Sequence, residues 1–251
     1  MDGCFSIAAA CGAKGRTELY NVAREPEIVD LQGFLRSLGA EITGAGSGCI
    51  VVQGGRPLHA GEYTVMSDRI AAATYLCAVA SAGGEGEILG AESGHLLPVL
   101  EALTGAGCRI VCEENRRIWI QRKRPLRGIG TVTTGPYPGF PTDAQPMLAS
   151  AEGKSRIIEK IFDHRFRYLQ GLARMGASIR AEGDTAHILG SPLRGACVEA
   201  TDLRGGAALV VAVLGAKGSS QIWGLQHMDR GYERLEAGLQ ELGGRISRRT
   251  G

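Results

Sequence analysis

The sequence of 251 residues has little of several features that would mark a particular class of protein. Aromatic residues make up only 5%, the formal net charge is +2, and 44% of the residues are hydrophobic by type. A net charge near zero produces no whole-chain field that would attract nucleic acid or an anionic membrane. The hydrophobic content is too high for a disordered chain. We therefore expect a globular protein whose partners include neither nucleic acid nor a membrane.

Signals for metal binding, disulfides and membrane insertion are also missing. The longest uncharged apolar run, residues 205–216, is far shorter than the roughly 18–20 residues that a membrane span needs. The seven cysteines include no C-x-x-C pair, the five histidines lack metal-ligand spacing, and the first residues carry no basic signal-peptide region. These absences predict a protein without metal or cofactor that keeps its thiols reduced in the cytoplasm.

Glycine, in contrast, is abundant, and it marks an internal repeat. The chain has 38 glycines among 251 residues, roughly twice the usual share. Residues 31–42, 100–110, 169–179 and 235–246 each combine a helical spacing of apolar residues with a small-residue break before a strand. The break glycines are Gly39, Gly107, Gly176 and Gly243, which lie 68, 69 and 67 residues apart. We expect each of them to end a helix in the left-handed conformation, and the first three to be followed by a β-hairpin.

A second helix is predicted in each repeat, because an aspartate precedes an alanine-rich or apolar stretch. The candidate N-caps are Asp68, Asp143 and Asp202, whose carboxylates can accept the free N–H groups of a first helical turn. With the hairpins, these helices give a repeated β-α-β-α-β-β unit, of which the first copy lacks its initial elements. The sequence therefore predicts an α/β protein in which sheets surround buried helices.

The loop before Asp143 has an unusual composition. Pro136, Pro138 and Pro141 fix three φ angles and stiffen the approach to this aspartate. The residues alone favour Asp143 as a simple helix cap, although its rigid approach also suits a positioned catalytic group.

Three further segments combine arginines with acidic or aromatic residues. Asp202 with Arg204, and Asp229 with Arg230, are predicted at helix starts, where the helix dipole favours a phosphate or carboxylate. Structural ion pairs at the caps are the alternative. Arg165 lies among phenylalanines in residues 161–169, a pattern that also fits a helix with a charged outer stripe.

These segments resemble a known family. The strings AREPEIVD (23–30), GPYPGFPTDAQP (135–146), IFDHRFRYLQGLARMGA (161–177), ATDLR (200–204) and DRGYERLE (229–236) are similar to those of UDP-N-acetylglucosamine enolpyruvyl transferases. The resemblance covers essentially the whole chain and matches the C-terminal three-fifths of the family pattern. It implies two domains, each an inside-out α/β barrel of three repeats. Residues 1–66 would be a remnant of the first domain, and residues 67–251 would form the second.

The resemblance also implies an activity and the residues that perform it. The family transfers enolpyruvyl from phosphoenolpyruvate to the 3′-hydroxyl of UDP-N-acetylglucosamine, the first committed step of bacterial peptidoglycan synthesis. Asp143 would be the general base and would bind the sugar hydroxyl. The other substrate-binding residues would be Ile161, which contacts the nucleotide sugar, Arg165, and Arg230, which holds phosphoenolpyruvate. A supporting network in the cleft would comprise Asp202, Arg204 and Phe162.

Parts of the family pattern have no counterpart in this sequence. The N-terminal Lys-Asn pair and the loop with the catalytic cysteine are absent, and none of the seven cysteines lies in that loop motif. The predicted helix after Asp143 is shorter than the family's by about four residues, close to one turn. We therefore expect either an enzyme whose missing N-terminal part is supplied elsewhere, or an inactive homologue or binding module that keeps the fold. An RNA-cyclase-like relative of the same fold is a third interpretation, which no motif supports.

Overall fold

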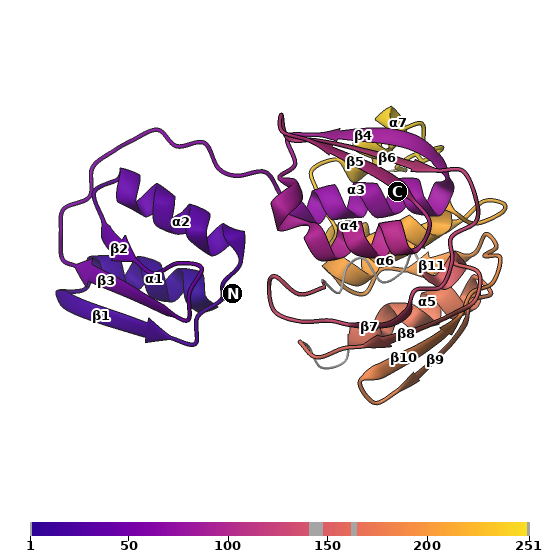
Figure 1. Cartoon of the computed structure of the whole chain (residues 1–251), viewed down its shortest axis with the longest axis horizontal. Coiled ribbons are helices and arrows are strands. Elements are labelled where there is room, and N and C mark those ends of the chain that lie inside the picture. The colour runs from indigo at the N-terminus through magenta and orange to yellow at the C-terminus, as the bar shows by residue number, and fades with distance from the viewer. Residues whose placement is uncertain (1, 141–147, 162–164, 250–251) are drawn as a thin grey trace. The chain divides into compact units, whose positions relative to one another are not determined.

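The computed structural model describes residues 2–140, 148–161 and 165–249, in which helices alternate with short strands. The chain divides into two compact units. One comprises Met1–Ser67 with Pro136–Pro138, and the other comprises Asp68–Gly135 with Gly139–Gly251. Each unit contains copies of the same arrangement of helices and strands, and Figure 1 labels them in chain order.

The first unit packs two helices against a three-stranded sheet (Figure 1). Its elements are α1 (Asp2–Gly12), β1 (Gly15–Tyr20), α2 (Pro26–Ser37), β2 (Glu41–Thr43) and β3 (Cys49–Gly54). The strand order is β1-β3-β2, and both pairs are antiparallel.

The helical spacing of residues 31–42 places Phe34 beside Leu35 on one apolar face, but α2 buries only part of that face. Ile28 and Leu35, two helical turns apart, are buried in the core of this unit. Phe34 is 36% exposed, and its ring meets the Tyr63 ring edge-on at 5.6 Å. The segment that follows β3 thus covers Phe34 instead of the core.

The second unit contains three further copies of the repeat. Its elements are α3 (Arg69–Ala82), β4 (Gly84–Leu89), η1 (Ser93–His95), α4 (Leu97–Gly105), β5 (Arg109–Glu113), β6 (Arg117–Arg122), β7 (Gly130–Thr133), β8 (Lys154–Ile158), η3 (Arg165–Tyr168), α5 (Leu169–Arg174), β9 (Ser178–Glu182), β10 (Thr185–Leu189), β11 (Cys197–Glu199), α6 (Leu203–Leu214), β12 (Gln221–Trp223), η4 (Leu225–His227) and α7 (Leu235–Glu241). The sheet orders are β4-β6-β5, β7-β8-β10-β9 and β11-β12.

The copies of the repeat predicted from the glycine spacing share strand pairings. Three strands pair antiparallel with the second strand of the hairpin that follows them: β1 with β3, β4 with β6, and β8 with β10. The initial strand pairs parallel with its neighbour in two copies, as β7 with β8 and β11 with β12. These pairings give the expected mixed α/β fold, whereas closure of the sheets into a barrel stays a prediction.

All four break glycines end their helices as predicted. The φ angles are +98° at Gly39, +101° at Gly107, +89° at Gly176 and +85° at Gly243. Each glycine N–H binds the carbonyl three residues earlier, and the next N–H binds the carbonyl five residues earlier, which belongs to Leu35, Leu103, Leu172 or Leu239. This is the Schellman arrangement, whose left-handed residue is usually glycine because glycine has no Cβ. All four leucines are buried, so each helix end also anchors the core.

The core of the second unit is built around α3 and α6, which pack against each other. Figure 1 shows both helices between the sheet β4-β6-β5 and the sheet β7-β8-β10-β9. Most of their side chains are buried, and many are alanines, whose small size allows two helices to approach closely. Asp68 caps α3 as predicted, because its Oδ1 accepts the N–H groups of Ile70 at 2.7 Å and Ala71 at 3.0 Å.

Candidate active site

The first turn of α6 carries two of the residues expected in the site. Asp202 caps the helix as predicted, since its Oδ1 accepts the N–H of Gly205 at 2.7 Å. Arg204 lies on the same turn and is half-buried. The free N–H groups at a helix N-terminus carry partial positive charge, which adds to the charge of Arg204. This end of α6 therefore favours an anionic group.

Arg230 is held near this turn by two close approaches at glycines. A Cβ on Gly231 would lie 2.7 Å from Cδ2 of Leu203, and a Cβ on Gly206 would lie 2.7 Å from Cγ and Sδ of Met228. Residues 228–231 therefore lie against the first turn of α6, and the Arg230 side chain is exposed there. The structure thus brings Arg230 to the end of α6 that carries the predicted cap and arginine.

The N-termini of α3 and α6 lie at the same end of the second unit, because the two helices are parallel. At their C-terminal ends, a Cβ on Gly215 would lie 2.5 Å from the Ser81 hydroxyl. Toward their N-terminal ends, the buried hydroxyl of Thr74 in α3 lies 2.9 Å from the hydroxyl of Tyr232, two residues after Arg230. Two helix dipoles with their positive ends together strengthen the preference for an anion.

Asp229 and Arg230 do not begin a helix, which corrects the sequence prediction. α7 begins at Leu235, and the residue before it, Arg234, has a left-handed φ of +46° and no side-chain cap bond. Asp229 instead accepts two hydrogen bonds from the Arg248 guanidinium, at 2.7 and 2.6 Å. These bonds lower the pKa of Asp229 and raise the pKa of Arg248. The aspartate thus binds the C-terminal tail, while Arg230 keeps an exposed side chain.

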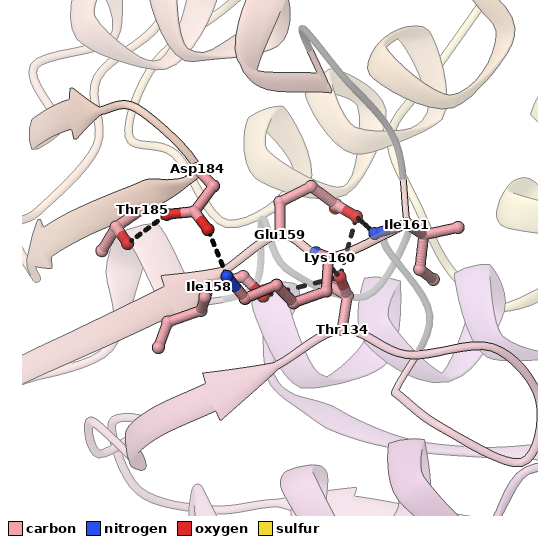
Figure 2. A network of polar contacts seen from close by, with 7 residues as sticks. All are labelled: Thr134, Ile158, Glu159, Lys160, Ile161, Asp184 and Thr185. Carbon is pink, nitrogen blue, oxygen red and sulfur yellow. Dashed lines mark hydrogen bonds and ion pairs between the residues drawn. The ribbon is translucent and has the colours of Figure 1, made fainter.

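Ile161 lies just beyond β8, where a buried carboxylate holds the backbone (Figure 2). The Oε1 atom of Glu159 accepts the Thr134 hydroxyl at 2.7 Å and the Ile161 N–H at 2.9 Å. The Thr134 oxygen in turn accepts the N–H of Lys160 at 2.9 Å. At the exposed end of the network, Lys160 Nζ bonds the Asp184 carboxylate, which lowers the pKa of Asp184. The carboxylate and the hydroxyl together join the ends of β7 and β8.

Glu159 and Thr134 are not among the predicted site residues, although the sequence holds a signal for the carboxylate. Alternate residues of β8, Ser155 and Ile157, are buried, and the same period of two puts Glu159 in the buried phase. A buried carboxylate needs hydrogen-bond donors, so a glutamate in this phase indicates a polar network. The strand pattern does not reveal which residue supplies the donor, because Thr134 lies 25 residues earlier.

The structure describes only some of the remaining predicted residues. Asp143 and Phe162 lie outside the residues that the structure describes. Arg165 begins η3, which packs against α6. The backbone therefore brings the Arg165 position to the helix that carries Asp202 and Arg204.

A second surface feature lies apart from these residues. The exposed face of the sheet β7-β8-β10-β9 is hollowed and basic, with Lys154, Arg156, Arg180 and His187 among its lining residues. Among the predicted site residues whose side chains the structure describes, none lines this hollow. Within the described part of the chain, no three His, Cys, Asp or Glu side chains are grouped to hold a metal ion, and no helix is long and apolar enough to cross a bilayer.

Comparison with known protein families gives a match over residues 5–239 to EPSP synthase (3-phosphoshikimate 1-carboxyvinyltransferase). The chain belongs to the EPSP synthase family. It is 48% identical over 247 residues to "UDP-N-acetylglucosamine 1-carboxyvinyltransferase 2" of Caldanaerobacter subterraneus subsp. tengcongensis, a match that covers 96% of this chain and 59% of the relative. It is 45% identical over 255 residues to UDP-N-acetylglucosamine 1-carboxyvinyltransferase of Afipia carboxidovorans, covering 98% of this chain and 58% of the relative.

Among solved structures, this EPSP synthase family chain is similar to the enolpyruvyl transferase NikO from Streptomyces tendae. The TM-score is 0.81 at 29% sequence identity, and the match covers 94% of this chain and 57% of that one. The resemblance drawn from the sequence strings is thereby confirmed, and so is the enolpyruvyl transferase-like α/β fold. The chain spans about three-fifths of the length of the curated relatives that it matches.

Proposed function

We propose that this EPSP synthase family chain supplies the C-terminal part of an enzyme that transfers enolpyruvyl from phosphoenolpyruvate to the 3′-hydroxyl of UDP-N-acetylglucosamine. The observation that carries this proposal is the identity of 45–48% to UDP-N-acetylglucosamine 1-carboxyvinyltransferases over nearly all of the chain. The product would enter peptidoglycan synthesis in the bacterial cytoplasm.

The proposed reaction requires a base for the sugar hydroxyl. Asp143 takes the proton of the 3′-hydroxyl, and the sugar oxygen bonds C2 of phosphoenolpyruvate while C3 gains a proton. A tetrahedral intermediate results. Loss of a proton from C3 and of phosphate from C2 then restores the carbon–carbon double bond and yields the enolpyruvyl ether and inorganic phosphate.

Arg204 and Arg230 lie near the start of α6 and suit the anionic groups of phosphoenolpyruvate. Arg204 lies on the first turn, and Arg230 lies against it. The Arg165 position begins a turn that packs on the same helix. A guanidinium can bind a carboxylate or phosphate through two parallel hydrogen bonds. Ile161, whose backbone N–H is hydrogen-bonded to Glu159, would contact the nucleotide sugar.

The test adds the segment of the Caldanaerobacter relative that the chain does not match, and follows phosphate release from phosphoenolpyruvate. Release is expected only when UDP-N-acetylglucosamine is also present. Asp143→Ala should lower the rate by about 10²–10⁴-fold, because it removes the general base, and should leave the circular dichroism spectrum unchanged. Asp184→Asn is the matched control, since it alters an exposed carboxylate of the same unit, and it should keep the wild-type rate.

Two outcomes would contradict this proposal. The wild-type chain could release no phosphate even with the added segment, which would favour the inactive homologue or binding module. An Asp143→Ala chain with full activity would exclude this aspartate as the base.

A further inference from the structure

The position directly after the second strand of each repeat can be compared through the strand register. The last residue of that strand pairs with the first residue of the returning hairpin strand: Tyr20 with Cys49, Leu89 with Arg117, and Ile158 with Thr185. In the fourth repeat, Trp223 pairs with Glu199 as Ile158 pairs with Thr133. The next residue therefore occupies one equivalent position in all four repeats, held by Asn21, Gly90, Glu159 and Gly224.

These four positions, directly after the second strand of each repeat, are the strand exits, and Glu159 is the exception among them. The φ angle is +53° at Asn21, +78° at Gly90 and +81° at Gly224, so the backbone itself turns the chain away from the sheet. Glu159 is not among the described residues with a positive φ, and it is only 5% exposed. A left-handed residue needs no partner to make its turn. A buried carboxylate persists only where hydrogen-bond donors surround it.

The residue opposite this position differs in the same way. Thr134 in the third repeat stands where the fourth repeat has Ala200, because the N–H of each binds the carbonyl of the neighbouring strand's last residue at 2.9 Å. In the fourth repeat the two backbones are in close contact, since a Cβ on Gly224 would collide with the Ala200 carbonyl oxygen. In the third repeat a hydroxyl and a carboxylate fill this place. Their hydrogen bonds extend to the backbone N–H groups of the next two residues, Lys160 and Ile161 (Figure 2).

We propose that Glu159 and Thr134 form a positioning pair that fixes the Ile161 backbone for binding of the nucleotide sugar. This inference rests on the proposed function, in which Ile161 contacts UDP-N-acetylglucosamine. The pair ties together the ends of β7 and β8. A backbone that is fixed before the ligand arrives loses less conformational freedom on binding.

Variants that keep the hydrogen bonds of the pair can be compared with variants that remove them. This comparison distinguishes a positioning role from a role in packing alone. Glu159→Gln keeps a carbonyl oxygen that can accept both hydrogen bonds, and Thr134→Ser keeps the hydroxyl. Glu159→Ala removes the acceptor, and Thr134→Val removes the hydroxyl at nearly constant volume. Asp184→Asn is the control, because it breaks only the ion pair at the exposed end of the same network.

The experiment measures two quantities for each variant: hydrogen exchange of the Ile161 amide in the 251-residue chain, and the Kd for UDP-N-acetylglucosamine with the relative's N-terminal segment added. Glu159→Ala and Thr134→Val should speed the exchange and raise the Kd, each by about tenfold or more, since about tenfold is the factor expected for one lost buried hydrogen bond. Glu159→Gln, Thr134→Ser and Asp184→Asn should stay within about threefold of wild type in both, since each keeps the two bonds of the pair.

The results that would contradict the pair, its positioning role and the proposed function differ from one another. Unchanged Ile161 exchange in Glu159→Ala or Thr134→Val would overturn the pair itself, as would a Gln variant as impaired as the Ala variant. Faster exchange with an unchanged Kd would overturn the positioning role while leaving the proposed function in place. If Glu159→Ala fails to fold, Thr134→Val against Thr134→Ser decides the matter. A wild-type chain that does not bind UDP-N-acetylglucosamine would overturn the proposed function, and this inference with it.

Discussion

The helix ends of the four repeats are built alike, whereas the strand exits are not. The same two backbone hydrogen bonds recur at Gly39, Gly107, Gly176 and Gly243, each above a buried leucine. Beyond the second strand, in contrast, three repeats turn through a left-handed residue and the third turns around the Glu159 carboxylate. A helix end must bury its leucine to complete the core, which leaves little choice of residue. A strand exit lies past the last hydrogen bond between the strands, so its residue can serve binding or catalysis.

The largest effect on stability is expected for the leucine at a helix end. Leu103 is fully buried, and its carbonyl accepts the N–H that closes the end of α4. Leu103→Ala should lower the free energy of unfolding by about 2–5 kcal/mol, because it leaves a cavity in the core. Urea unfolding measures the change. Leu97→Ala in the same helix, at a position 54% exposed, should change it by no more than about 0.5 kcal/mol. Equal losses in the two variants would contradict this account of the helix end.

The second helix end also protects a thiol. Cys108 follows Gly107, and burial raises the pKa of its thiol to about 11. Because the thiolate is the reactive form, Cys108 should react with iodoacetamide at pH 8 at least roughly 100-fold more slowly than an exposed cysteine. Cys112 is exposed and lies in the strand that follows, so it is the internal reference, and mass spectrometry can follow both peptides. Similar rates would show that this helix end opens easily.

A smaller loss is expected from the glycine itself. Gly107 has a φ of +101°, and a Cβ there would meet no atom within 4 Å, so only the backbone conformation opposes a side chain. Gly107→Ala should therefore cost about 1–2 kcal/mol in the free energy of unfolding. Gly105→Ala is the matched control, because Gly105 is the last helical residue of α4 and its Cβ would make an ordinary contact with Ile129 at 3.6 Å. The control should be neutral or stabilising.

The smallest effect is expected after η4 in the fourth repeat, where Asp229 binds the C-terminal tail. Hydrogen bonding from Arg248 lowers the pKa of Asp229 below its ordinary 3.8. The folded state therefore binds this proton more weakly than the unfolded state. The contribution to stability is present above the ordinary pKa and is lost as the pH falls through the folded pKa. The pair is exposed, so Asp229→Asn should change stability little at pH 7 and not at all in about 1 M salt, where charges are screened.

Acid unfolding curves of wild type and Asp229→Asn check this last prediction. The two curves should converge below pH 3.8. A difference that grows as the pH falls would show that Asp229 stabilises the tail in some other way.

Features that depend on local sequence could be predicted well. The left-handed glycines, the Asp68 and Asp202 caps and the hairpins each follow from residues within one helical turn or one strand pair. The prediction of a helix start at Asp229 was wrong although the local signal was similar. There the chain passes through η4 and a left-handed Arg234 before α7 begins.

Pairings between distant residues could not be predicted in the same way. Thr134 meets Glu159 only because β7 and β8 are parallel neighbours, and Asp229 meets Arg248 only because the tail returns to this segment. The approach of Arg230 to α6 likewise depends on close contacts at Gly206 and Gly231. The resemblance to a family supplied the site residues, whereas the strand register was needed to find the positioning pair.

The most direct measurement compares one variant at a helix end with one variant at a strand exit. For Gly107→Ala and Glu159→Ala, the free energy of unfolding and the Kd for UDP-N-acetylglucosamine are determined with the relative's N-terminal segment present. Gly107→Ala is predicted to lose stability while its Kd stays within about twofold of wild type, whereas Glu159→Ala is predicted to raise the Kd about tenfold. Equal shifts of the Kd in both variants, or a Glu159→Ala chain with lower stability and an unchanged Kd, would contradict the division between helix ends that hold the fold and a strand exit that holds the site.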